Sequence, residues 1–122
     1  MNKQIEKFED LEVWKEAMHL AVMIYDYLKE SRDYGLKDQM QRAAVSIPKN
    51  IAEGYERNSN KEFIQYLYIA KASCGELRTQ IYLAIRIKLV SETIGNKSLE
   101  LSKKISAMLF KLIRTRKEKF QQ

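Results

Sequence analysis

The stretch AAVSIPKNIAEGYER, residues 43–57, decides how the chain is interpreted, because it places the protein's single proline inside a helical pattern. On both sides of Pro48, apolar side chains recur every three or four residues, the spacing of one helix face. They are Leu36, Met40, Ala44, Ile47, Ile51 and Tyr55. Because this register continues across the proline, we expect one helix over about residues 36–57, kinked at Pro48 where a backbone hydrogen bond is lost. The alternative is a break, in which Ser46 caps a new helix and Pro48 lies in its first turn.

Other segments repeat apolar side chains with the same helical spacing. Asp10 is the predicted N-cap of a helix over about residues 11–30. The stripe of this helix that we expect to face the core contains Leu11, Trp14, Met18, Ala21, Tyr25 and Leu28. Ser59 and Glu62 form a predicted capping box, which opens a third helix over about residues 60–90.

A fourth helix is predicted over about residues 97–118. SETIGNKS, residues 91–98, contains Gly95 and Asn96 and is therefore expected to be a connection. Helices joined by short links pack as antiparallel neighbours. The sequence thus predicts an all-α fold, an antiparallel up-and-down four-helix bundle with a Pro-kinked second helix, in a single domain over residues 1–122.

The second and third helices are predicted to form a close pair. In such a hairpin, residues whose numbers sum to about 117 would lie opposite each other. Small residues occur on both partners at these positions: Ala43, Ala44 and Ser46, and Ala72, Ser73, Cys74 and Gly75. Because glycine costs about 1 kcal/mol of helix propensity, we expect close packing to be the reason for Gly75.

Positive charge is concentrated toward the end of the chain. The net charge is +6, and residues 91–122 contain eight Lys and Arg against three Asp and Glu. Cations at such density bind phosphate backbones, which makes the last helix a candidate nucleic-acid site. The candidate residues are Lys97, Lys103, Lys104, Lys111, Arg114, Arg116, Lys117 and Lys119. The alternative is a solvated lysine face that only keeps the protein in solution.

The first and third helices each carry a second apolar stripe beside the one assigned to the core. One core needs a single stripe per helix, so the surplus predicts contact between copies of the chain. The candidate interface residues are Val13, Leu20, Ile24, Tyr27, Ile64, Tyr68, Tyr82 and Ile87. The alternative is a tightly wrapped core with tyrosines at its margin.

Residues for catalysis or metal binding are scarce. Glu16 and His19 have the Glu-x-x-His spacing of di-metal bundles, but His19 is the only histidine, so no second copy of the motif exists. We therefore predict no metal, no cofactor and no enzyme activity. Cys74 is the only cysteine and is expected to be a buried small apolar residue in a reducing compartment. Without a signal peptide or a membrane-spanning segment in its sequence, the protein is expected to be cytoplasmic.

Large parts of the sequence resemble a family of small bacterial four-helix proteins, first noticed as reading frames within intervening sequences of 23S ribosomal RNA genes. The resemblance lies in FEDLEVWKEA at 8–17, YGLKDQMQRAAVSIPKNIAEGYER at 34–57 and KEFIQYLYIAKASCGELRTQ at 61–80. It implies a four-helix bundle that assembles as a ring, a homopentamer. It also implies a relation to the accessory protein of diversity-generating retroelements, a basic barrel-shaped oligomer thought to bind nucleic acid and a reverse transcriptase. It implies no catalytic residue.

Together these observations predict a non-enzymatic homo-oligomeric module that binds RNA or DNA through its basic last helix. The alternative is a protein-interaction scaffold without a nucleic-acid role, whose apolar surface holds another helical protein.

Overall fold

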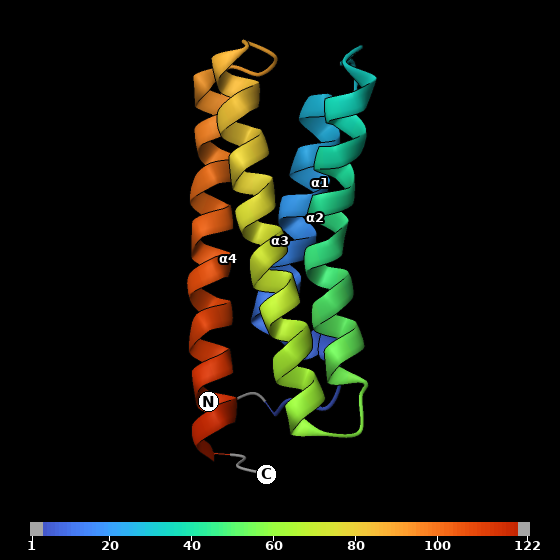
Figure 1. Ribbon diagram of the computed structural model, residues 1–122, viewed down its shortest axis with the longest axis vertical. Helices are drawn as coiled ribbons and strands as arrows, with labels where there is room; N and C mark the ends of the chain where they lie inside the picture. The colour runs from blue at the N-terminus through green and yellow to red at the C-terminus, as the bar shows by residue number, and fades with distance from the viewer. Residues whose placement is uncertain (1–3, 120–122) are drawn as a thin grey trace.

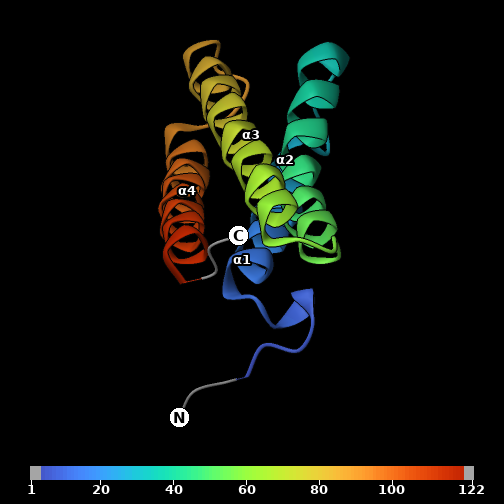
Figure 2. The same cartoon turned by 60° about the horizontal axis from the view of Figure 1, so that its bottom comes forward.

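The computed structural model describes residues 4–119, in which the regular structure is entirely helical. After a short 3-10 turn, Phe8–Asp10, the chain forms α1 (Glu12–Leu28), α2 (Tyr34–Tyr55), α3 (Asn60–Arg86) and α4 (Glu92–Lys119). Figure 1 shows the chain running up α1, down α2, up α3 and down α4. Each helix packs against two others in the cyclic order α1, α2, α3, α4, and Figure 2 shows the same arrangement from below. The predicted all-α four-helix bundle is confirmed.

The core lies along the bundle axis and draws on all four helices. Its largest fully buried side chains are Leu20, Ile24, Leu28, Met40, Ile47, Ile51, Leu67, Cys74, Leu77, Ile81, Ile105 and Leu109. Within residues 4–119, none of the helices is long and apolar enough to cross a membrane.

Helix α2 continues through Pro48, so the proline does not separate two elements. A polar cluster lies beside it. The Asn50 side chain donates to the Ser46 carbonyl oxygen at 2.7 Å and to the Ser46 hydroxyl at 2.9 Å, and Ser46 bonds Ser73 of α3 at 2.8 Å. These bonds satisfy buried polar groups at the α2–α3 contact. Ser46 and Asn50, two polar residues of the stretch at 43–57, therefore stabilise the contact between α2 and α3.

The α2–α3 register is close to the expected one. Ser46 and Ser73, and Glu53 and Tyr66, are bonded pairs whose numbers sum to 119, two more than predicted. The close approach, however, is at Gly54, where a Cβ atom would lie 2.5 Å from Tyr66 Cβ.

The packing explanation for Gly75 is wrong. A Cβ atom there would meet only Arg78 Nη2, at 3.9 Å.

Two predicted helix ends also differ from the structure. Asp10 does not cap α1; it lies in the preceding turn, where its carboxylate accepts from the backbone N–H groups of Glu6 and Lys7. These backbone bonds, that of Glu6 foremost, lower the Asp10 pKa. The N-cap position is Leu11, which makes no side-chain bond.

The predicted connection over residues 91–98 is largely helical. Helix α3 ends at Arg86, and α4 already begins at Glu92, with the Ser91 hydroxyl accepting from the N–H of Ile94. Gly95 is a packing glycine, because a Cβ atom there would lie 2.5 Å from Ile85 Cγ1. Its small size lets the ends of α3 and α4 meet.

Both stripes of α1 contribute to the core. Ala21 and Leu28 of the predicted core stripe are buried, but Met18 and Tyr25 of that stripe are 39% and 46% exposed. In the second stripe, Val13, Ala17, Leu20 and Ile24 are all buried. The buried positions are aliphatic, and an aromatic and a methionine side chain lie at the margin. Val13, Leu20 and Ile24 are thus buried within one chain and do not present a surface to another copy, which corrects their assignment to an interface.

Candidate functional site

The basic side chains of α4 lie on different faces, and the heptad Lys97, Lys104 and Lys111 lies toward α1. Lys104 Nζ donates to Glu16 Oε2 at 2.6 Å. Lys111 lines a surface groove that also contains Glu12. The positive charge of this face is therefore offset by carboxylates of α1.

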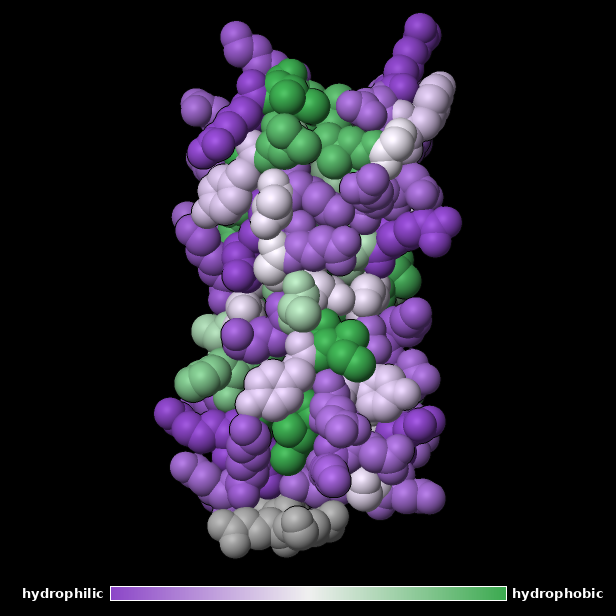
Figure 3. Space-filling view, viewed as in Figure 1, coloured by the Kyte–Doolittle hydropathy of each residue, from purple (hydrophilic) through white to green (hydrophobic). Residues whose placement is uncertain are grey.

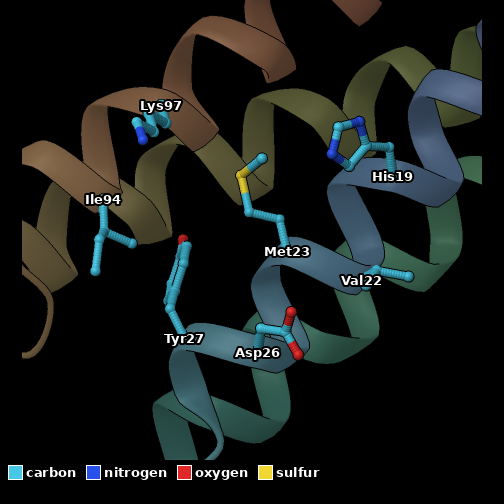
Figure 4. Close-up of a pocket in the computed structure, with 7 residues that line it drawn as sticks. All are labelled: His19, Val22, Met23, Asp26, Tyr27, Ile94 and Lys97. Atoms are coloured by element: carbon cyan, nitrogen blue, oxygen red, sulfur yellow. The ribbon is translucent and has the colours of Figure 1, made fainter.

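Lys97 belongs to a second α1–α4 groove, shown in Figure 4. Its lining consists of His19, Val22, Met23, Asp26 and Tyr27 from α1, with Ile94 and Lys97 from α4. The Tyr27 hydroxyl extends toward α4 and bonds Ser98 at 3.1 Å. Within residues 4–119, no three His, Cys, Asp or Glu side chains are grouped so as to hold a metal ion.

A different groove runs between the outer faces of α3 and α4, which lie side by side in Figures 1 and 2. We call it the α3–α4 groove; it is lined by Lys71, Arg78, Lys103, Ser106, Ala107 and Phe110. No carboxylate is among these lining residues. By contrast, the two α1–α4 grooves and an α1–α2 groove include Asp26, Glu12 and Asp38, respectively.

Further cations extend the α3–α4 groove toward the end of α4. The Arg114 guanidinium lies 5.9 Å from the ring centroid of Phe110. Lys117 Nζ donates to the Tyr68 hydroxyl at 2.7 Å and lies 5.0 Å from the centroid of that ring. Cations and exposed aromatic rings therefore alternate along this surface.

The groove cations make no ion pair within the part of the chain that the structure describes. The ion pairs found there use Lys15, Arg42, Arg57 and Lys104. In addition, Arg78 Nη1 is buried and has no hydrogen-bond acceptor among residues 4–119. An unpaired buried donor is costly, so this guanidinium is suited to an anion that enters the groove.

Cys74 lies behind the groove and is fully buried. Burial raises its thiol pKa to about 11, against the opposing effect of the nearby Arg78 and Lys71. The thiol is therefore protonated near neutral pH, which does not suit a nucleophile.

Arg116, near the end of α4, contacts two residues at the start of α3. Its Nε donates to Asn60 Oδ1 at 2.7 Å, and its guanidinium lies 5.0 Å from the centroid of Phe63. Partial burial lowers its pKa. Arg116 thus joins the end of α4 to the start of α3, whereas Lys119, in the last described turn, is exposed.

The predicted interface residues that are not in the core lie at several places on the surface. Tyr27 and Ile64 are half-buried. Tyr68, Tyr82 and Ile87 are 47%, 42% and 50% exposed. Tyr68 and Tyr82 lie 14 residues apart on the face of α3 that borders the α3–α4 groove.

Lys71 and Arg78 are the groove residues that the sequence analysis missed. Their seven-residue spacing puts both on one face of α3, and this was the available signal. Only the packing of α3 against α4 shows that they lie opposite Phe110 and Lys103.

Comparisons with known proteins give a family and a structural relative. The family model described as 23S rRNA-intervening sequence protein matches residues 9–111. A crystal structure of a protein from Bacteroides thetaiotaomicron, described as of unknown function and from the S23 ribosomal protein family, is similar with a TM-score of 0.80 and 27% sequence identity. The similarity covers 84% of this chain and 99% of that one. No curated protein matches the sequence.

Proposed function

This chain belongs to the 23S rRNA-intervening sequence protein family, and from that premise we propose that it is a non-enzymatic module that binds RNA or DNA in the α3–α4 groove. The observation that supports the proposal most is the charge of the groove. Its lining contains Lys71, Arg78 and Lys103 without a carboxylate, and Arg114 and Lys117 extend it. Unpaired cations in a row attract the phosphates of a nucleic-acid backbone.

Only some of the α4 cations predicted to bind nucleic acid lie at this groove. Lys103, Arg114 and Lys117 remain as binding residues, and Lys71 and Arg78 of α3 join them. Lys97, Lys104 and Lys111 face the carboxylate-bearing surface of α1 and are assigned lesser roles. Arg116 is assigned to stability, because Asn60 and Phe63 engage its guanidinium.

Salt-dependent titration tests this function. We expect binding to weaken as salt rises, because each phosphate contact releases condensed counterions. The double variant Arg78→Gln/Lys103→Gln should reduce the slope of log K against log salt by about 1.4 on a single strand, at about 0.7 per contact. The variant Lys29→Gln/Lys49→Gln, which removes the same charge from exposed positions just after α1 and on α2, should leave the slope unchanged.

Absence of binding at low salt, or equal effects of the two double variants, would contradict the proposal. A protein partner recovered in fixed stoichiometry after nuclease treatment, together with absent nucleic-acid binding, would favour the scaffold alternative.

We also propose that copies of the chain associate through exposed apolar side chains of α3 and of the turn that follows it. Ile69, Leu83 and Ile87 are 48%, 48% and 50% exposed, and apolar side chains gather at the upper end of the face in Figure 3, where α3 ends and α4 begins. Contiguous exposed apolar surface is uncommon on monomers. The family resemblance suggests five copies.

For the location of the protein we propose the cytoplasm, because the free Cys74 thiol fits a reducing compartment.

Light scattering tests the association. The full chain is expected to give a mass several times its 14.4 kDa, and Leu83→Lys/Ile87→Lys should lower that mass by placing charge in the contact. The exposed control Met18→Lys, on α1, should not lower it. A wild-type protein that stays monomeric at high concentration would exclude the association.

A further inference from the structure

We infer that the α3–α4 groove takes a single strand, whose bases stack on aromatic side chains while its phosphates meet the groove cations; this inference rests on the proposed function. Phe110 lines the groove, and Tyr68 and Tyr82 lie on the same side of α3 as Lys71 and Arg78 by their helical spacing. Tyr68, Tyr82 and Phe110 are 47%, 42% and 56% exposed. Exposed rings between cations are the usual platform for single-stranded nucleic acid, whose base faces are free.

The spacing of the rings suits an extended strand. Tyr68 and Tyr82 are separated by 14 residues, which is ~21 Å along α3 at 1.5 Å per residue. Lys71 lies between these two positions on α3, Phe110 of α4 lines the groove beside it, and Arg114 lies 5.9 Å from the ring centroid of Phe110. A strand that follows the groove would thus meet rings and cations from both helices. A duplex would present its backbone and base edges but not its base faces, because its bases are stacked on each other.

Gly75 supports a ligand that approaches closely. It lies within α3, midway between Tyr68 and Tyr82 on the same face. No tight contact inside the protein requires its small size, since a Cβ atom would meet only Arg78 Nη2 at 3.9 Å. Glycine is a poor helix former, and it leaves open space beside Arg78 for an approaching backbone.

Arg78 supplies a matching contact for a phosphate. Its buried Nη1 has no acceptor among residues 4–119, and a phosphate oxygen would provide one. Guanidinium groups bind phosphate through paired N–H donors, so Arg78 can hold the backbone while the rings hold the bases.

Fluorescence anisotropy on the full chain tests this inference. The probes are a 12-nucleotide oligo-U, a 12-nucleotide oligo-dT and a 12-base-pair duplex at one salt concentration. Single strands should bind about 10-fold more tightly than the duplex. Phe110→Ala and Tyr82→Ala should each weaken single-strand binding about 5-fold or more, leaving duplex affinity unchanged. Tyr25→Ala, at a ring of similar exposure on the α1–α2 groove, is the matched control and should change neither.

A third groove variant separates an effect on binding from an effect on folding. Gly75→Leu should keep the helical circular dichroism and should not lower the unfolding midpoint, because leucine is a better helix former than glycine. It should weaken single-strand binding by filling the groove. Binding of either single strand supports the inference, and the tighter of the two identifies the sugar. Equal affinity for single strand and duplex, or unaltered binding by all three groove variants, would overturn the inference and leave the proposed function standing. No binding to any probe would overturn the proposed function itself.

Discussion

Gly54 and Gly75 both lie inside helices, but their surroundings differ. A Cβ atom on Gly54 would lie 2.5 Å from Tyr66 Cβ and 3.3 Å from the Phe63 carbonyl oxygen. These neighbours belong to a well-packed helix pair and cannot retreat without cost. Gly75 has no such neighbour, so its substitution meets no obstacle within the protein.

The two glycines therefore predict opposite effects on stability. Gly54→Ala should lower the free energy of unfolding by about 1–3 kcal/mol through overpacking. Gly75→Ala should raise it by about 0.5–1 kcal/mol, because alanine is the better helix former. Urea unfolding followed by circular dichroism gives both values. A Gly54→Ala protein as stable as wild type would show that α2 and α3 are not in close contact there.

Cys74 predicts a pH dependence at alkaline pH. Burial raises its pKa from 9.0 to about 11, so the folded state keeps a proton that the unfolded chain loses. The resulting stability is fully present below pH 9 and is lost as pH rises toward 11. At 1.36 kcal/mol per pKa unit, we expect a loss of about 2 kcal/mol between pH 8 and 10.5.

The control for this effect is Cys74→Ala, since other groups also titrate in the same range. The difference in unfolding free energy between wild type and Cys74→Ala should shrink by that amount as pH rises. A difference that stays constant from pH 8 to 10.5 would show that the thiol is not desolvated.

At the scale of helices, the start of α3 and the end of α4 are joined by reciprocal bonds. Arg116 Nε donates to Asn60 Oδ1 at 2.7 Å, and Asn60 Nδ2 donates to the Arg116 carbonyl oxygen at 3.1 Å. Arg116 also lies over Phe63. The last turns of α4 are thus held against α3 at the end of the groove.

Arg116→Ala is expected to lower the free energy of unfolding by about 1.5–3 kcal/mol, the range for a hydrogen bond to a charged group. Lys119→Ala, at an exposed position three residues later, should change it by less than about 0.5 kcal/mol. Thermal or urea unfolding measures both. Nucleic-acid affinity at a temperature where both variants are folded should be nearly unchanged in Arg116→Ala and reduced in Lys117→Ala; the reverse order would contradict the roles assigned to them.

Helical periodicity predicted the existence of all four helices, and local capping chemistry predicted the start of α3, where the Ser59 hydroxyl accepts from the Glu62 N–H at 3.1 Å. Helical periodicity did not show which stripe of α1 is buried more completely, because both stripes have the right spacing. Burial is decided by the neighbouring helices, which favour the aliphatic Leu20 and Ile24 over Met18 and Tyr25. The prediction that Gly95 lies in a connection is wrong for a similar reason. Glycine is favoured both in turns and where two helices approach closely, so its presence does not distinguish them.

The candidate site was predictable only on one of its two helices. The cations of α4 stand out by their density, but their division between two faces depends on how α4 is rotated in the bundle. Lys71 and Arg78 lie 32 and 25 residues before Lys103 in the sequence, and the antiparallel packing of α3 and α4 brings them to the same groove.

For the whole molecule, the distribution of charge matters more than its sum. The net charge is +6, yet the α1–α4 and α1–α2 grooves contain carboxylates beside their cations. The α3–α4 groove alone among these four lacks them in its lining. An anionic ligand would therefore be drawn to one side of the bundle, opposite α1 and α2.

Mapping the bound ligand on the protein tests this account most directly. In amide chemical-shift titrations of the full chain with a 12-nucleotide single strand, we predict that the shifts concentrate at residues 68–82 of α3 and 103–117 of α4. Residues 12–28 of α1 should change little. Shifts concentrated on α1 and on the Lys97, Lys104 and Lys111 face, or spread evenly over the bundle, would contradict the account.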